Sequence, residues 1–381
     1  MDNLRLKYDG INASLSIFST ESGRKEIHGI FIPVGTEEGI AGQCEKIVSA
    51  IGKFLQSGEG MGVVPVMKRV FLSDVSTQGE TVLSAFKDIG GAISLIGQSP
   101  LYPSVKVAAL VFMVSGVEPK SQSENVTIVR RGKYKDLWFT GGRVQGNSYE
   151  STLNLFESLS ENMTRSEMRF DTDCLRTWLL VKDIDNRYRG VVDARNRFFE
   201  KHGLTSETHF IASTGIEGSN CDPHAVVTLD AFATSGLKKE QVRYLNVPLR
   251  MNRTSDYGVA FERGTAVDYG DRTHVIVSGT ASIDHEGNVV GVGSVGQQCD
   301  RMCGNVDALL LEGGATIADI SHIIVYLRDM SDSLWVKEFI ASRYPDVPVI
   351  VVLAPVCRPQ WLVEMECMAI VKSENSGYAP Y

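Results

Sequence analysis

The chain has 381 residues, of which 43% are apolar and 22% charged, and this composition is typical of a packed globular protein with two or three domains. Its net charge of −8 and its scattered Lys and Arg residues exclude a nucleic-acid-binding stripe. No apolar run approaches the roughly 18–20 residues that span a bilayer, and residues 1–10 lack the apolar core of a signal peptide, so we expect a cytoplasmic protein that does not bind membranes.

The same succession of predicted elements occurs three times along the chain, and strand 69–74, strand 176–183 and strand 324–329 each end in an aspartate. The first copy is predicted to contain a helix over 39–55, the strand 69–74, and a strand pair over 93–96 and 105–113. The second contains a strand over 137–142, a helix over 148–159, the strand 176–183, a helix over 187–201, and a pair over 210–213 and 225–233. The third contains a strand over 275–280, a helix over 296–311, the strand 324–329, a helix over 332–343, and a pair over 349–354 and 362–371.

This succession predicts an α+β fold in which each unit has the order β-β-α-β-α-β-β. We place the units at 1–118, 130–235 and 245–372, with linkers near 116–130 and 234–245. The first copy is the most degenerate.

The third unit resembles the YjgF-type reactive-intermediate deaminase (Rid) family, also described as endoribonuclease L-PSP-like. The resemblance rests on five segments: 277–283 (VSGTASI), 287–290 (GNVV), 297–305, 325–329 (VYLRD) and 363–369 (VEMECMA). It implies a chorismate-mutase-like α+β domain of the kind that assembles as a trimer with active sites between subunits. Three fused units would then form a pseudo-trimer within one chain, and the protein would be a monomer or a low-order homo-oligomer.

A narrower resemblance is to chorismatases, Rid-fold enzymes that hydrolyse the enol ether of chorismate and release pyruvate. It rests on 357–366 (CRPQWLVEME) and on Tyr257-Gly258 with Phe261 and Arg263, leading into 278–282 (SGTAS). In the second unit it rests on 176–178 (RTW), 193–199 (DARNRFF) and 213–216 (STGI). The resemblance implies a small anionic metabolite as partner, with no metal or organic cofactor.

Glu364 is the residue best suited to enol-ether hydrolysis, because the reaction begins with protonation of a methylene carbon by a carboxylic acid. Strand alternation puts Glu364 and Glu366 on one face, and two close carboxylates favour one of them keeping its proton. The alternative is a solvated glutamate on an exposed face. The corresponding positions are expected to carry Thr228 in the second unit and Lys106 in the first, so only the third unit holds an acid, and the other two would act as walls.

Cys357 lies seven residues before Glu364 in a predicted hairpin loop. Its thiol would act as a nucleophile or proton donor if Arg358 lowered its pKa, and the alternative is an inert small apolar residue. Among chorismatases, a cysteine at this place resembles the subgroup that forms a hydroxybenzoate rather than a dihydroxy-cyclohexadienoate.

A dianionic substrate such as chorismate needs planar cationic donors. The candidate carboxylate binders are Tyr257, Arg263, Arg143, Arg358 and Arg176. Each arginine taken alone is equally well explained by a surface ion pair. Backbone N–H groups of Gly279, Thr280 and Ala281 are predicted at the rim of the pocket.

Several patterns weigh against other chemistry. Val349 aligns with the arginine that holds the substrate carboxylate in Rid deaminases, which disfavours the usual imine deamination. Cys299 and Cys303 share a helix face without further zinc ligands nearby, and the histidines show no ligand spacing.

Our prediction is a chorismatase-like hydrolase. The alternatives are a diverged Rid-type imine or enamine hydrolase and a non-catalytic Rid-like protein that binds a small metabolite or a protein partner.

Overall fold

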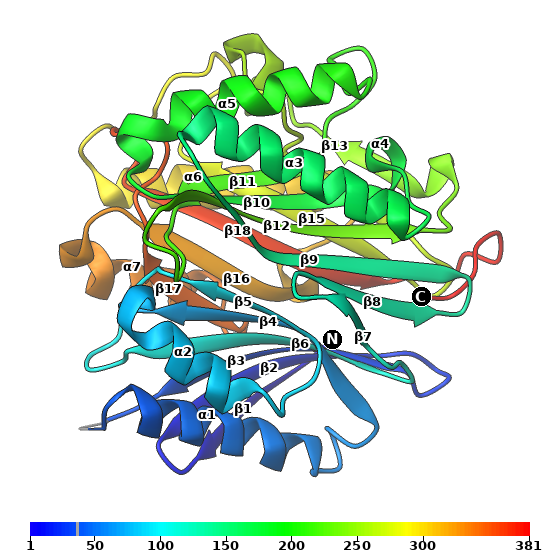
Figure 1. Ribbon diagram of the computed structural model, residues 1–381, viewed down its shortest axis with the longest axis vertical. Coiled ribbons are helices and arrows are strands. Elements are labelled where there is room, and N and C mark those ends of the chain that lie inside the picture. The colour runs from blue at the N-terminus through cyan, green and yellow to red at the C-terminus, as the bar shows by residue number, and fades with distance from the viewer. Residues whose placement is uncertain (36–37) are drawn as a thin grey trace.

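The computed structural model describes residues 1–35 and 38–381, and within them three six-stranded mixed sheets each carry helices on one face (Figure 1). The first unit comprises β1 Asp2–Tyr8, β2 Ile11–Ser19, β3 Lys25–Pro33, α1 Ile40–Leu55, β4 Val63–Leu72, α2 Val75–Phe86, β5 Ala92–Ile96 and β6 Val107–Ser115. The second comprises β7 Lys120–Ser123, β8 Val126–Arg131, β9 Tyr134–Gln145, α3 Ser148–Arg165, α4 Phe170–Asp173, β10 Cys174–Val181, α5 Ile184–Lys201, β11 Ala212–Glu217 and β12 Ala225–Ser235.

The third unit begins with the short 3-10 helix η1 and has three further 3-10 turns along its length. It comprises η1 Lys239–Gln241, β13 Val242–Leu245, η2 Thr254–Tyr257, β14 Gly264–Asp268, β15 Arg272–Ala281, α6 Val295–Glu312, η3 Ile317–Asp319, β16 Ile320–Leu327, η4 Met330–Asp332, α7 Ser333–Arg343, β17 Val349–Leu353 and β18 Val363–Lys372. None of the helices in the described residues is long and apolar enough to cross a membrane.

All three sheets have one strand order, which confirms the predicted repeat and the α+β class. In the third unit the order is β13-β14-β15-β18-β16-β17, and the same relative order holds for β1 to β6 and for β7 to β12. The last two strands in each sheet run parallel, as β16 and β17 do, because a helix lies between them in the chain.

Each unit has one more strand than predicted, so its order is β-β-β-α-β-α-β-β. Both expected linkers contain strands: β7 and all but the last residue of β8 fall within 116–130, and β13 falls within 234–245. The strands β7 and β13 lie at sheet edges and are short, and β7 is exposed along its whole length. Such edge strands carry no apolar alternation by which a sequence pattern reveals them.

The three units close into a ring in which each contacts both of the others. Single β-bridges join Gly97 to Ser219 between the first and second units, Ile216 to Val356 between the second and third, and Val352 to Pro100 between the third and first. In each case a residue in or just after the fifth strand of one unit (β5, β11 or β17) pairs with a residue in the loop before the sixth strand of the next unit (β12, β18 or β6). The helices lie outside and the sheets face inward, with α1 and α2 at the bottom of the view and α3 and α5 at the top (Figure 1).

Candidate active site

A cavity of about 340 Å³ lies between the second and third units, and Glu364 is one of its walls. We call it the acid cavity. The second unit supplies side chains from α5 and β11, and the third supplies the segment around Tyr257, the end of β15, the loop before β18, and β18 itself. The lining residues are Asp185, Tyr188, Arg189, Val192, Arg195, Ser213, Gly215, 257–259, Phe261, Arg263, Gly279, Ala281, Ile283, Cys357, Arg358, Trp361 and Glu364.

Glu364 is held in this cavity by the register of β18. It pairs with Ala281 of β15 on one side and Tyr326 of β16 on the other, and only 5% of its surface is exposed. No hydrogen bond or ion pair to its carboxyl group is present among the described residues. Burial first, and the nearby charge of Glu366 second, raise the pKa of Glu364 to about 8. The carboxyl group therefore keeps its proton at neutral pH.

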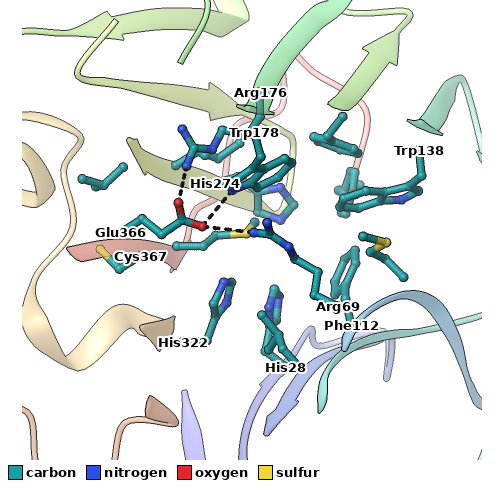
Figure 2. Close-up of a pocket in the computed structure, with 17 residues that line it drawn as sticks. His28, Arg69, Phe112, Trp138, Arg176, Trp178, His274, His322, Glu366 and Cys367 are labelled. Carbon is teal, nitrogen blue, oxygen red and sulfur yellow. Dashed lines mark hydrogen bonds and ion pairs between the residues drawn. The ribbon is translucent and has the colours of Figure 1, made fainter. Parts of the chain in front are cut away.

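Glu366 lies two residues further along and has the opposite character. Each of its carboxylate oxygens accepts two hydrogen bonds, Oε1 from Arg69 Nη1 (3.3 Å) and Trp178 Nε1 (2.8 Å), and Oε2 from Arg176 Nη2 (2.8 Å) and Thr214 Oγ1 (2.6 Å) (Figure 2). Burial opposes its ionisation, but Arg176 and Arg69 lower the pKa of Glu366 below its usual range. Glu366 is thus a fixed negative charge beside a neutral Glu364. Arg176 belongs to this network and does not line the acid cavity.

Cys357 lines the acid cavity beside Glu364, but its thiol is not activated. Burial, with a smaller contribution from Glu364, raises the pKa of Cys357 to about 12 despite the opposing effect of Arg358. Arg358 donates instead to the carbonyl oxygen of Gly287 (3.1 Å) and lies over the rings of Tyr257 and Trp361. Of the two roles considered for Cys357, a neutral thiol fits that of proton donor and not that of nucleophile, and a hydrogen bond from the Tyr188 hydroxyl group only partly opposes the rise in the pKa of Cys357.

Four arginines line the acid cavity, of which Arg189 is exposed and pairs with Asp193 (2.9 Å), and the other three come from different elements. Arg263 follows Phe261 and donates to the backbone oxygen of Asn252 (3.1 Å), while its Nε has no partner in the described part of the chain. Arg195 comes from α5, is only 1% exposed, and leaves Nε and Nη2 without partners there. Together with Arg358 they supply planar donors for an anionic ligand.

Two features of the predicted site differ in the structure. Arg143 does not line the acid cavity, because β9 lies on the far side of β12 from β10 and β11, and the exposed Arg143 side chain forms an ion pair with Glu124 (3.3 Å). The backbone N–H of Gly279 donates to Thr214 Oγ1 (2.8 Å), and Thr280 is fully buried and does not line the cavity. Gly279 and Ala281 thus shape the wall instead of donating to a ligand. A Cβ at Gly279 would stand 2.1 Å from Glu364 Oε1, so only glycine leaves space for the acid.

In the other two units the strand position of Glu364 carries a residue that is not an acid. The strand register puts Thr228 at the position of Glu364 in the second unit, and Ala108 in the first. The expected residue in the first unit, Lys106, is therefore wrong. Leu72 pairs with Val107 just as Leu327 pairs with Val363, so the residue after Val107 is the one that corresponds to Glu364. The junction of the first and second units is closed, with Gly79 packed against Cys221 so tightly that a Cβ there would stand 2.4 Å from its sulfur.

The junction of the third and first units is an open groove of about 630 Å³. Val349 and Val351 line it, and the register shows that they correspond to Ser213 and Gly215 of the acid cavity. Val349 therefore faces a different cleft from Glu364, and the residue that faces the acid from this strand position is Ser213.

Arg195, Tyr188 and Ser213 were missed by the sequence reasoning. Arg195 had a detectable signal, because it falls on the buried face of α5 between Val191 and Phe198, where an arginine is unusual. Tyr188 and Ser213 carry no such signal, since they reach Glu364 only through the contact between units.

The described residues contain no group of three or more His, Cys, Asp or Glu side chains that could hold a metal ion.

Comparisons with known proteins agree with this fold. Residues 264–371 match the family model of endoribonuclease L-PSP. A 3-hydroxybenzoate synthase from Streptomyces hygroscopicus is 27% identical over 297 residues, which cover 69% of this chain and 82% of that protein. A RutC family protein from Pyrococcus abyssi is 30% identical over 97 residues, covering 25% of this chain and 76% of that protein. The crystal structure of a chorismatase has the same fold, with a TM-score of 0.63 and 19% identity over 80% of this chain and 93% of its own.

Proposed function

From the premise that the chain belongs to the YjgF/RutC (Rid) superfamily, we propose that it is a chorismate-processing hydrolase that cleaves the enol ether of chorismate or of a related anionic cyclic enol ether. The names of two relatives, a 3-hydroxybenzoate synthase and a chorismatase, support this substrate class. The observation that carries the proposal is the buried carboxyl group of Glu364, whose pKa burial raises, in a cavity that is also lined by Arg195, Arg263 and Arg358.

In the proposed reaction, Glu364 is the general acid. It transfers its proton to the methylene carbon of the enol ether, and the ether carbon becomes an oxocarbenium ion. The negative charge of Glu366 and the new carboxylate of Glu364 both stabilise that cation. Water adds to the cation and returns a proton to Glu364, and the resulting hemiketal breaks its C–O bond to release pyruvate and a ring alcohol.

Arg263, Arg195 and Arg358 bind the substrate carboxylates in this proposal, and Tyr257 contributes its hydroxyl group. Their N–H groups approach from two units, so the cavity is formed only when the chain has closed its ring. Uncompensated cations in a partly enclosed space favour an anionic substrate even though the whole protein is acidic.

Cys357 is placed to influence which ring product forms. A neutral thiol beside the ring can donate or relay a proton during loss of the ring hydroxyl, which gives a hydroxybenzoate. Chorismate then yields pyruvate and hydroxybenzoate without net uptake of water, whereas simple hydrolysis takes up one water and gives a dihydroxy-cyclohexadienoate. The 3-hydroxybenzoate synthase relative supports the first product.

The test is pyruvate release from chorismate by wild type, Glu364→Gln and Glu338→Gln, with the ring product identified by mass spectrometry. Glu338 is an exposed glutamate of α7 and serves as the matched control. We expect activity in wild type and Glu338→Gln, and a loss of about 10²–10⁴-fold in Glu364→Gln, which is the usual contribution of a general acid. Absence of pyruvate from folded wild-type protein would reject the proposal and favour an imine or enamine substrate or a binding role.

A further inference from the structure

A second cavity lies at the centre of the ring, where all three sheets meet. It measures about 70 Å³ and is lined from the first unit by His28, Arg69 and Phe112, from the second by Trp138, Arg176 and Trp178, and from the third by His274, His322 and Glu366, among others (Figure 2). One water needs roughly 10–15 Å³ of such volume, so the central cavity has room for about five non-hydrogen atoms. This central cavity is separate from the acid cavity. The strand β18 contributes Glu366 to the central cavity and Glu364 to the acid cavity.

Buried donors without partners line this cavity. In the described part of the chain, Arg69 leaves Nε and Nη2 unbonded, Arg176 leaves Nε and Nη1 unbonded, and Trp138 leaves its indole Nε1 unbonded. All three residues are more than nine-tenths buried. An unsatisfied buried donor costs roughly 1–3 kcal/mol, and more if it is charged, so several in one cavity indicate that something accepts hydrogen bonds there.

The charge in the central cavity is positive. The two guanidinium groups both lie 4.7 Å from the centre of the Trp178 ring and share the single carboxylate of Glu366. Two further acids lie behind the lining residues. Glu26 contacts His28 (3.4 Å) and His274 (3.0 Å), but its charge is balanced by Arg272 (2.7 Å). Asp230 is 4.0 Å from Arg69 Nη2, and burial raises the pKa of Asp230, which weakens its compensation of Arg69. Burial also lowers the pKa of His28 and His322, so the excess charge resides on the arginines.

We propose that the central cavity binds a small monocarboxylate of the size of formate or acetate. A planar carboxylate matches the geometry of guanidinium donors, and one negative charge balances the excess. The remaining walls, which include Leu110, Phe112 and Phe232, are apolar and accommodate a methyl group. A polyvalent anion such as phosphate would fit by atom count, but its charge exceeds the single excess positive charge.

The test measures thermal unfolding of the whole chain against increasing sodium acetate, with sodium chloride at the same concentrations as the comparison. A ligand that binds only the folded state raises the Tm in a saturable way. Trp138→Phe removes one donor and keeps an aromatic ring, and we expect it to weaken acetate binding about tenfold, as loss of a hydrogen bond to a charged group does. The matched control is Trp335→Phe, because Trp335 is 45% exposed and stacks on Phe339 outside the cavity.

A second control separates this site from the arginines of the acid cavity. Arg195→Lys should still show the increase in Tm with acetate. If acetate no longer raised the Tm of Arg195→Lys but still raised that of Trp138→Phe, acetate would bind in the acid cavity and the proposal would be overturned. Equal stabilisation by chloride would overturn the choice of a carboxylate. A crystal structure of the wild type grown in acetate gives the direct answer: planar density between Arg69, Arg176 and Trp138 supports the proposal, and water alone rejects it.

Discussion

Glu364 and Glu366 lie on the same face of β18, two residues apart, and the fold drives their carboxyl groups to opposite charge states. Burial and the charge of Glu366 raise the pKa of Glu364 to about 8, while four hydrogen bonds and two arginines lower that of Glu366. The arginines come from the first and second units. The first unit does not line the acid cavity, but its Arg69 binds Glu366, and the charge of Glu366 raises the pKa of Glu364.

The first prediction concerns the pH dependence of pyruvate release. Because the proposed mechanism needs protonated Glu364, kcat should be constant below its pKa and fall as pH rises through about 8. Glu366→Gln removes the charge that raises this pKa and leaves Arg176 uncompensated, so the fall should move to lower pH by about one unit. Initial rates between pH 5 and 10 measure both. An unchanged midpoint in a folded Glu366→Gln protein would contradict the coupling.

A second prediction concerns stability. Glu364 titrates near 4.5 in the unfolded chain and near 8 in the folded protein, so the folded state binds the extra proton between these values and loses stability as pH rises through them. Glu364→Gln abolishes this loss. Its free energy of unfolding should match that of the wild type near pH 4.5 and exceed it by roughly 2–4 kcal/mol near pH 8.5, at about 1.4 kcal/mol for each pKa unit.

Urea denaturation of both proteins at the two pH values measures the difference. Glu338→Gln is again the control, since an exposed glutamate should show no pH-dependent gain. A Glu364→Gln protein that is no more stable than the wild type at pH 8.5 would contradict a raised pKa of Glu364 in the folded state.

Local pattern was sufficient to predict the repeat. The helices α1, α5 and α6 and the strands β4, β10 and β16, which end two residues before Asp74, Asp183 and Asp329, are evident because buried faces impose a regular spacing of apolar residues. The edge strands β7 and β13 were missed because they are short and polar. Glu364 was identifiable as a carboxylate within an apolar strand, and the motif resemblance pointed to the same residue.

The rest of the site depends on contacts between units, which no local pattern records. Arg143 was expected in the pocket on a glycine-rich strand end, but its strand faces the closed junction with the first unit. The sequence left open whether Arg358 lowers the pKa of Cys357, and burial, which no local pattern records, raises this pKa instead. The roles of Ser213 and Tyr188 at the cavity emerge only from the contact of the second unit with the third, whereas Arg195 could have been found as an arginine on the buried face of α5.

The third prediction tests substrate binding by the second unit. Arg195→Lys keeps a positive charge but loses the planar donors Nε and Nη2, so KM should rise about tenfold or more with a smaller effect on kcat. Arg165→Lys on α3 is the matched control, because the Arg165 side chain is 66% exposed and pairs only with Glu161 at the surface. Steady-state kinetics with chorismate measures both. Equal KM values for the three proteins would exclude Arg195 as a carboxylate binder.

The fourth prediction concerns the space that Gly279 leaves for the acid. A Cβ at this position would stand 2.1 Å from Glu364 Oε1 and 2.9 Å from Thr214 Cγ2, so Gly279→Ala must displace the carboxyl group or the strand that carries it. We expect pyruvate release to fall by at least 100-fold, because a misplacement of about 1 Å is enough for such a loss. The control is Gly52→Ala in α1, where a Cβ meets nothing within 4 Å and alanine should stabilise the helix by roughly 0.5–1 kcal/mol. If Gly279→Ala retained full activity, the carboxyl group of Glu364 would have to act from a position other than the one against Gly279, and the assignment of the acid cavity as the reaction site would fail.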